Sequence, residues 1–398
     1  MQAQIQDLAA DLQTEVVQVR RHLHQYPELS FQEHQTAAYI ADRLASWGIP
    51  HAYPVANTGI VALIEGEAGD GPCLALRADH DALPIQEANE VAYRSQHEGI
   101  MHACGHDVHT ASLLGTARIL WQMRARLRGR VKLLFQPGEE QVPGGASLLI
   151  KEGALDNPRP QAIFGQHVHP PLPVGKVGFR PGLFMASTDE IYLTIRGKGG
   201  HGAVPQHTID PIAISAQVIT GLQQLISRQL DPTIPAVLTF GYIASEGGAT
   251  NIIPEAVQLK GTLRLMDEKW RTEAHQLLQR TAEGIASAFG GRAELRIAHG
   301  YPFLKNDEAL TSRAITYAQE YLGPENVVEL PMRMTGEDFA YYSQEIPACF
   351  YRLGTGNPAK NITSGVHTPT FDVDEDCLAH STGLMAWLAF RELEQAIR

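Results

Sequence analysis

The sequence predicts an α/β fold, in which a mostly parallel sheet flanked by helices is interrupted by a smaller inserted α+β domain. Three observations support this fold class. Short apolar runs rich in Val, Ile, Leu and Phe have the character of buried strands. These runs alternate with segments of helical periodicity, which is typical of a parallel sheet covered by helices on both faces. The middle of the chain instead shows the order β-α-β-β-α-β, which predicts a ferredoxin-like unit.

The elements of the outer domain follow from the spacing of apolar residues and from the residues that stop each run. Apolar positions recur at helical spacing up to Gly48, which ends a helix because glycine readily adopts the left-handed conformation. The strands are bounded by Gly, Pro or charged residues. We therefore expect helices at 5–25, 33–47, 110–126 and 375–397, and strands at 60–64, 73–78, 131–135 and 162–165.

The inserted domain is expected at 187–297, so that 1–186 and 298–398 together form the outer domain. The segments that define it alternate in the ferredoxin-like order given above. Its strands are expected at 191–196, 236–242, 256–265 and 292–297, and its helices at 210–228 and 267–289.

Composition excludes several classes of protein. The 32 Lys and Arg residues against 44 Asp and Glu give a net charge of −12, which argues against a nucleic-acid partner because phosphate binding needs concentrated positive charge. No apolar run approaches the roughly 18 residues of a membrane helix, and no secretion signal is visible. Four dispersed cysteines are no disulfide framework. We expect a cytoplasmic protein with no membrane partner.

The segment 101–109 holds three histidines and one cysteine, just before a predicted helix. Cys104 and His106 flank Gly105, whose backbone freedom allows a loop to direct both side chains at one point. Thiolate and imidazole together suit zinc and its borderline-soft neighbours. Taken alone, the pair also fits a buried structural cysteine beside surface histidines.

Three further segments bring similar residues to the ends of predicted strands. The carboxyl ends of parallel strands meet at one edge of a sheet, where open α/β sheets bind their ligands. Separately, each group fits a solvated turn or surface imidazoles; together with Cys104 they predict a metal or catalytic site. The groups are Asp79-His80-Asp81 after 73–78, Glu139-Glu140 after 131–135, and His167 with His169 after 162–165.

His367 lies in a Gly/Thr/Pro loop shortly before the last predicted helix, which Asp374 could cap. Its position alone is consistent with a metal ligand or with a turn residue.

Several motifs resemble one family over nearly the whole chain and in the right order. The family is the amidohydrolase branch of the aminoacylase/carboxypeptidase superfamily of di-metal peptidases, which includes hippurate hydrolases, N-acyl-amino-acid amidohydrolases and plant auxin-conjugate hydrolases. The motifs are Arg77-Ala-Asp-His-Asp-Ala-Leu-Pro84, Met101-His-Ala-Cys-Gly-His-Asp-Val-His109, Gln136-Pro-Gly-Glu-Glu140, His167-Val-His169, Gly199-Gly-His-Gly-Ala203, Asn251-Ile-Ile-Pro254, Gly336-Glu-Asp-Phe339 and His367-Thr-Pro.

The resemblance implies a di-zinc exopeptidase-like catalytic domain at 1–186 and 298–398, with 187–297 as a lid and dimerisation domain. It implies a metal-dependent hydrolase that cleaves the amide bond of N-acyl (acetyl, aroyl or indole-acyl) L-amino acids to a carboxylic acid and a free amino acid. The implied cofactors are two divalent ions per subunit, for which the ligand types tolerate Zn, Mn, Co or Ni. The implied assembly is a homodimer or homotetramer formed through the inserted domain.

The resemblance also implies roles for single residues. Glu139 matches the general base, Asp81 a carboxylate that orients a ligand, and His201 a histidine that reaches the catalytic site of the partner subunit. Asn251 and Arg264 match lid positions that touch the substrate. The implied metal ligands are Cys104, in the place of a bridging aspartate, with His106, Glu140, His167 and His367.

One residue departs from the family pattern. His80 stands where the branch has an apolar residue, often Met, and is either an extra ligand or an imidazole that fills the same space.

Four alternative functions remain at this stage. Within the enzyme class, the alternatives are a dipeptidase and an N-acetyl-diaminopimelate-type deacylase. Outside it, a catalytically inactive binding relative would lack the base or a ligand, whereas Glu139 and all the candidate ligands are present. A cysteine hydrolase would use Cys104 as its nucleophile.

Overall fold

The structure is a computed structural model that describes residues 1–395, and the chain divides into two compact units. The first unit comprises Met1–Gly182, Lys305–Pro331 and the chain from Asp338 onward. The second comprises Leu183–Leu304 and Met332–Glu337, so it is inserted into the sequence of the first.

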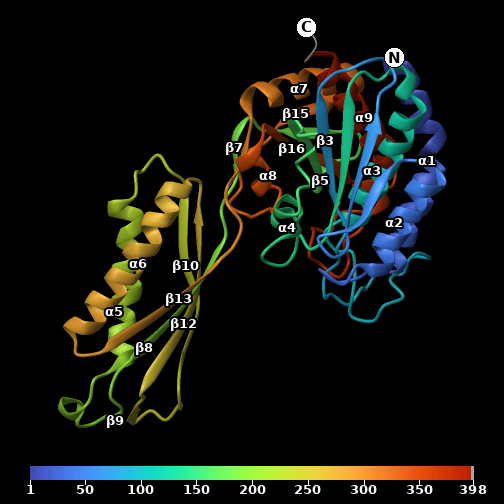
Figure 1. Cartoon of the computed structure of the whole chain (residues 1–398). Coiled ribbons are helices and arrows are strands. Elements are labelled where there is room, and N and C mark those ends of the chain that lie inside the picture. The colour runs from blue at the N-terminus through green and yellow to red at the C-terminus, as the bar shows by residue number, and fades with distance from the viewer. Residues whose placement is uncertain (396–398) are drawn as a thin grey trace. The chain divides into compact units, whose positions relative to one another are not determined.

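The first unit is built on an eight-stranded sheet in the order β1-β2-β4-β3-β5-β16-β6-β15 (Figure 1). The central strands β4, β3, β5 and β16 run parallel, whereas β1, β2 and β6 each form an antiparallel pair. The mostly parallel sheet expected from the sequence is thus confirmed. The strands are β1 (His51–Val55), β2 (Gly59–Glu65), β3 (Cys73–Asp79), β4 (Arg130–Gln136), β5 (Ala162–Pro173), β6 (Val177–Phe179), β15 (Val327–Glu329) and β16 (Ala348–Gly356).

Helices cover this sheet unequally. In Figure 1, α1, α3 and α9 lie on one side of the sheet, and their apolar residues join the main core together with those of α2 and α7. The short helices α4 and α8 contact each other as well as β4 and β16. The helices are α1 (Gln2–Gln25), α2 (His34–Ser46), α3 (His106–Gln122), α4 (Gly145–Lys151), α7 (Glu308–Leu322), α8 (Ala340–Glu345) and α9 (Cys377–Gln395).

Two predicted boundaries were wrong in ways that matter for the site. β5 continues to Pro173 instead of ending at 165, because β16 pairs with it as far as Gly356↔Pro173. α3 begins at His106 instead of 110, because Gly105 precedes it in the left-handed conformation (φ 82°). His167 therefore lies within a strand, and His106 lies in the first turn of a helix. Ile397, the predicted end of the last helix, lies outside the described residues.

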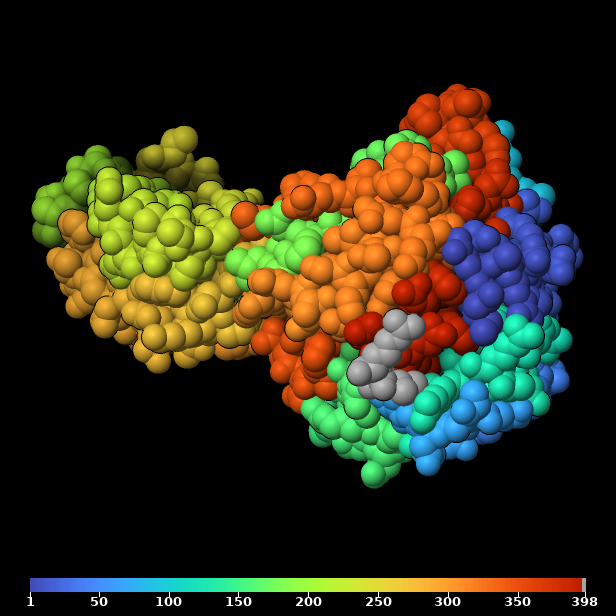
Figure 2. All heavy atoms as spheres, turned by 90° about the horizontal axis from the view of Figure 1, so that it is seen from above, coloured from blue at the N-terminus to red at the C-terminus, as the bar shows by residue number. Residues whose placement is uncertain are grey.

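Segments distant in the sequence share the surface of the first unit. Figure 2 shows the blue N-terminal residues next to the orange and red C-terminal ones. α1 contacts α9, and Gln2 donates a hydrogen bond to the Glu320 carbonyl oxygen near the end of α7 (2.6 Å). The N-terminal helix is therefore an integral part of the core.

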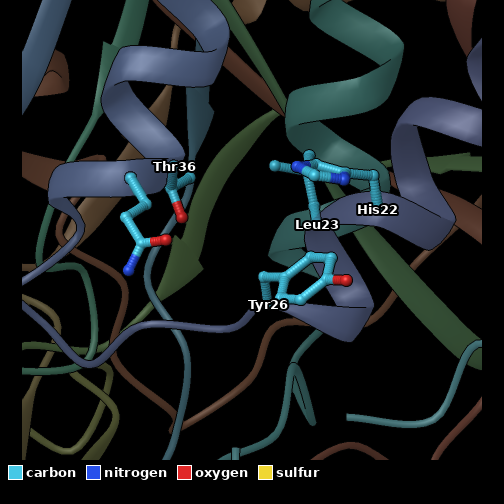
Figure 3. Close-up of a pocket in the computed structure, with 5 residues that line it drawn as sticks. His22, Leu23, Tyr26 and Thr36 are labelled. Atoms are coloured by element: carbon cyan, nitrogen blue, oxygen red, sulfur yellow. The ribbon is translucent and has the colours of Figure 1, made fainter. Parts of the chain in front are cut away.

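A small hollow of about 150 Å³ lies between α1 and α2 (Figure 3). Its lining includes none of the predicted site residues. The residues that line it are His22, Leu23, Tyr26, Gln35 and Thr36.

The second unit has a four-stranded antiparallel sheet in the order β10-β12-β8-β13, against which α5 and α6 pack. In chain order this is the ferredoxin-like arrangement expected from the sequence. α5 begins after Asp210, whose carboxylate accepts hydrogen bonds from Ile212 N and Ala213 N, with Pro211 at the first position. The elements are β8 (Asp189–Arg196), α5 (Pro211–Gln224), β10 (Ala236–Ser245), β12 (Ala256–Leu265), α6 (Glu268–Ala288) and β13 (Arg292–His299).

Smaller elements complete the chain. A two-stranded ribbon pairs β9 (Gly200–His201) with β11 (Ile252–Ile253), and another pairs β7 (Gly182–Met185) with β14 (Leu304–Asn306). A π-helical turn, Leu225–Gln229, follows α5. Within the described part of the chain, no helix combines the length and apolar character needed to cross a membrane.

The packing of α9 yields a prediction on stability. A Cβ at Gly383 would overlap the Tyr321 hydroxyl and meet the Ala9 Cβ at 3.0 Å, so Gly383→Ala should destabilise by about 1–3 kcal/mol. Gly284→Ala, on an exposed face of α6 with nothing within 4 Å of the new Cβ, should instead stabilise by about 0.5–1 kcal/mol. Differential scanning calorimetry of both variants measures the effects, and a Gly383→Ala transition at the wild-type temperature would contradict the packing.

Candidate metal centre and catalytic site

Several groups of potential metal ligands lie at the carboxyl end of the parallel strands, and two of them share one residue. Within each group, the candidate ligand atoms all lie within 4.8 Å of one another. Both groups contain Cys104, which precedes α3. The first group is Cys104, His106 and His167, and the second is Cys104, Glu140 and His367.

The backbone at Gly105 makes the first group possible. Gly105 has a φ of 82°, and a Cβ there would lie 2.6 Å from Val168 Cγ2 on β5. Only glycine fits so close to the neighbouring strand in this left-handed conformation. The turn consequently places the Cys104 side chain and the start of α3 directly against β5, which carries His167.

His106 is buried and has a ring nitrogen that points to negative charge. Its Nδ1 donates to Asp81 Oδ1 (3.0 Å), while its Nε2 has no hydrogen-bond partner among the described residues. That Nε2 lies 3.8 Å from Asp79 Oδ2 and 4.0 Å from both Glu139 Oε2 and Glu140 Oε1. Burial alone would lower the pKa of His106, but the charge of Asp79 and the bond to Asp81 raise it to about 10. The surrounding carboxylates thus favour a positive charge at the His106 ring.

His167 presents an unprotonated nitrogen to Cys104. Its Nδ1 lies 2.8 Å from the Val168 carbonyl oxygen, which only accepts, so the ring proton is on Nδ1. Its Nε2 lies 3.3 Å from Cys104 Sγ. Burial, with a further contribution from the charge of Arg352, holds the pKa of His167 well below its usual value. His167 is therefore neutral and oriented as a metal ligand requires.

The Cys104 thiol is not suited to act as a nucleophile without a cation. Burial raises its pKa well above the usual value, and the charges of Glu140, Glu139 and Asp79 raise it further. Nucleophilic cysteines need the opposite environment, one that lowers the pKa. A bound cation would supply the charge that a thiolate needs here.

The turn with Glu139 and Glu140 is held by two buried carboxylates. Glu33 Oε1 accepts from Gly138 N (2.8 Å), and Asp81 Oδ2 accepts from Glu140 N (3.0 Å). Asp81, which also binds His106, thus links two segments that carry candidate ligands. Burial would raise the pKa of Asp81, but its hydrogen bonds, led by the one from His106, lower it to about 2. The result is a permanently charged carboxylate behind the ligands.

His367 belongs with the ligand groups by its position. Its φ of 62° is rare for a residue with a side chain, and its backbone N–H donates to the Ala103 carbonyl oxygen (2.7 Å). Its Nε2 lies 3.1 Å from Glu140 Oε1, and this bond raises the pKa of the half-exposed imidazole. The sequence alone did not decide between a metal ligand and a turn residue at this position. In the structure, the loop holds His367 beside Cys104 and Glu140.

Three predicted site residues lie in the second unit. His201 and Asn251 are exposed at the β9–β11 ribbon, where Gly202 N donates to the Asn251 carbonyl oxygen (2.8 Å) and Ala203 N to His201 Nδ1 (3.0 Å). Arg264 is half-buried near the C-terminal end of β12, where it pairs with Val237 on β10. The structure therefore brings His201 and Asn251 together but does not place Arg264 with them.

His80 is completely buried, and neither ring nitrogen has a hydrogen-bond partner in residues 1–395. Burial lowers its pKa to about 4, so the imidazole is neutral.

Sequence reasoning missed a buried polar network next to Glu139. The Arg77 guanidinium on β3 donates to Asp79 Oδ2 (2.5 Å), to Gln136 Oε1 (2.8 Å) and to Asp338 Oδ1 (2.6 Å). A signal was present, because an arginine within the apolar run Cys73–Asp79 must be paired once the strand is buried. Asp338 lies in the motif Gly336-Glu-Asp-Phe339, but its pairing with Arg77 could not be found by spacing because the two residues are 261 positions apart.

The residues present fit a pair of divalent cations. The donors combine a thiol, imidazoles and a carboxylate, and a buried nitrogen of His106 lacks a partner while facing negative charge. This mixture suits Zn and its neighbours rather than Mg or Ca, which prefer oxygen ligands alone.

Comparison with known proteins agrees with this geometry. The model of the family described as Peptidase family M20/M25/M40 matches residues 75–390. The chain is 40% identical over 382 residues to N-acetylcysteine deacetylase of Bacillus subtilis, covering 96% of this chain and 97% of that protein. It is 44% identical over 306 residues to N-acyl-L-amino acid amidohydrolase of Geobacillus stearothermophilus, covering 77% of this chain and 82% of that protein.

A solved structure with the same fold is that of the Bacillus subtilis YXEP protein, described as a dinuclear metal binding peptidase of the M20 family. It superposes with a TM-score of 0.83 at 38% identity and covers 97% of this chain and 99% of the other. The resemblance drawn from the motifs is thereby confirmed, and the chain belongs to peptidase family M20/M25/M40.

Proposed function

We propose that this protein is a metal-dependent amidohydrolase that cleaves N-acyl L-amino acids to a carboxylic acid and a free amino acid. The observation that carries the proposal is the pair of ligand groups that share Cys104. Glu139 lies beside them, in a further group with His106 and Glu140, and the family resemblance assigns it the role of base. The acyl groups we infer are acetyl, aroyl or indole-acyl. The activities for which the deacetylase and amidohydrolase relatives are named support the same reaction class.

In this proposal Cys104, His106 and His167 would hold one ion, and Cys104, Glu140 and His367 would hold the other. Bound ions would supply the positive charge that polarises the amide carbonyl and makes water acidic near neutral pH. Asp81 orients His106 through the 3.0 Å bond to its Nδ1, which leaves Nε2 for coordination.

Glu139 is the general base. It is buried, adjacent to a candidate ligand, and its Oε2 lies 4.0 Å from His106 Nε2. A carboxylate in this position accepts the proton of the attacking water and later passes it to the leaving amine. An amide needs this second transfer, because an amine leaves only once it is protonated.

The second unit contributes the remaining proposed roles. His201 would donate a hydrogen bond to the oxyanion that forms from the amide carbonyl, delivered by the partner subunit of a homodimer or homotetramer. Asn251 and Arg264 would contact the substrate. A cytoplasmic location is part of the proposal and accords with four cysteines that are all free thiols.

A substrate panel tests the proposed function. The purified protein, stripped of metal and reconstituted separately with Zn, Mn, Co or Ni, is assayed for amine release from N-acetyl, N-benzoyl and indole-acetyl amino acids and from dipeptides. We expect turnover of N-acyl amino acids with at least one metal and its loss with EDTA. Turnover that survives EDTA, or turnover of dipeptides alone, would contradict the proposal.

Glu139 and Glu140 provide a matched pair of variants. Glu139→Gln should retain both ions but lower kcat by about 10²–10⁴-fold, because it cannot accept a proton. Glu140→Gln should lose metal together with activity, because the amide replaces a charged ligand. Metal content by atomic emission and kcat are measured on the same samples. A Glu139→Gln enzyme with wild-type kcat would remove Glu139 as the base.

Metal loading should release protons. In the metal-free protein Cys104 and His106 are protonated at neutral pH, because the pKa of each is raised. Binding needs a thiolate and a neutral imidazole, so affinity should rise with pH by about tenfold per pH unit for each proton released. Calorimetric titration at pH 7 in buffers of different ionisation enthalpy counts the protons. A count of zero would contradict these protonation states.

A further inference from the structure

A buried network fixes Asp338 next to the proposed base. The Asp338 side chain is fully buried, and its Oδ1 accepts from Arg77 Nη2 (2.6 Å) and from Gln136 Nε2 (2.8 Å). Its Oδ2 accepts from the same Gln136 amide (2.8 Å) and from the backbone N–H of Ala146 (3.0 Å). Donors from β3, β4 and the start of α4 therefore converge on one carboxylate.

The peptide of the same residue contacts Glu139. The Asp338 backbone N–H donates to Glu139 Oε1 (3.3 Å), and both residues are buried. The other oxygen, Oε2, is the one that faces His106 Nε2 at 4.0 Å. The hydrogen bond thus distinguishes the two carboxylate oxygens and turns Oε2 toward the candidate ligands.

We propose that Asp338 is a positioning residue for Glu139: its carboxylate is clamped by Arg77 and Gln136, and its peptide N–H sets the orientation of the Glu139 carboxylate. This inference rests on the proposed function, in which Glu139 is the base. Asp338 touches neither water nor substrate in this role, so its effect passes entirely through Glu139.

The anchored carboxylate explains how a contact made by the backbone of Asp338 can depend on its side chain. A backbone N–H is present in any residue but proline, so the hydrogen bond to Glu139 survives substitution in principle. The geometry of this hydrogen bond does not survive substitution, because the Asp338 carboxylate anchors the segment that carries the N–H. Proton transfer requires the reacting atoms to be placed closely, and displacement by about 1 Å costs on the order of 10²-fold in rate.

A double-mutant cycle tests this proposal. Asp338→Asn keeps the size of the side chain, but its amide NH₂ meets the N–H groups of Gln136 or Ala146 instead of accepting from them. We expect kcat to fall by about 10–10²-fold with unchanged KM and unchanged metal content. In the Glu139→Gln background, Asp338→Asn should lower the residual kcat no further, because the group through which it acts is gone.

Tyr342→Phe is the matched control. The Tyr342 hydroxyl donates to Gln136 Oε1 (3.2 Å) in the same buried cluster. We expect it to leave kcat within about twofold of wild type, which separates general loosening of the cluster from the loss at Asp338.

The outcomes distinguish this proposal from the proposed function. A wild-type enzyme without amidohydrolase activity, or a fully active Glu139→Gln, overturns the proposed function. An inactive Glu139→Gln combined with an unchanged kcat for Asp338→Asn overturns only the positioning role. Effects that multiply in the double variant, or a loss of metal in folded Asp338→Asn, also overturn it, because they show a general structural role.

A second variant covers the case in which Asp338→Asn does not fold. Gln136→Met keeps the ion pair between Arg77 and Asp338 but removes both amide hydrogen bonds to the Asp338 carboxylate. The same kcat loss, again abolished in the Glu139→Gln background, is expected. A wild-type kcat for Gln136→Met would overturn the proposal.

Discussion

Burial of negative charge at the ends of the parallel strands is the constraint on which the site depends. Asp79, Asp81 and Glu139 lie out of water at the same edge as Cys104, and a carboxylate in such surroundings needs a compensating positive charge. Arg77 is the one member of the network described above that carries fixed positive charge. The remaining compensation falls to the proton that makes His106 a cation, or to metal cations, while the neutral Cys104 thiol adds no further negative charge. Affinity for metal is therefore a consequence of how the sheet distributes charge.

The parts of the site that follow strands could be predicted from the sequence, because strand direction dictates where the following residues meet. Asp79 to Asp81 at the end of β3 and the paired carboxylates after β4 belong to this group, whereas Cys104 precedes α3 and His167 lies within β5. His367 does not belong to it either, since its left-handed backbone and its contact with the Ala103 carbonyl arise only in the folded chain. The resemblance to a family, rather than the spacing, gave the distinction between Glu139 and Glu140.

Contacts between distant segments were beyond the reach of pattern analysis. Ser30 donates to Asp81 Oδ2 (2.7 Å) and Glu33 binds Gly138 N, yet both lie in the N-terminal segment, which has no catalytic motif. The sequence predicted an end for β5 at 165 because the apolar run stops there, whereas pairing with β16 extends the strand to Pro173. Local composition gave the candidate ligands, and tertiary pairing determines how these residues are held.

The chemical state of the cysteines also determines how the protein withstands oxidants. All four are buried free thiols, and burial raises the pKa of each, for example to about 11 at Cys73 and about 12 at Cys349. Peroxide attacks thiolates, so the metal-free protein keeps even Cys104 in its unreactive form. In the proposed metal site the same residue would become a thiolate only with a cation bound to its sulfur, which lowers its reactivity toward peroxide.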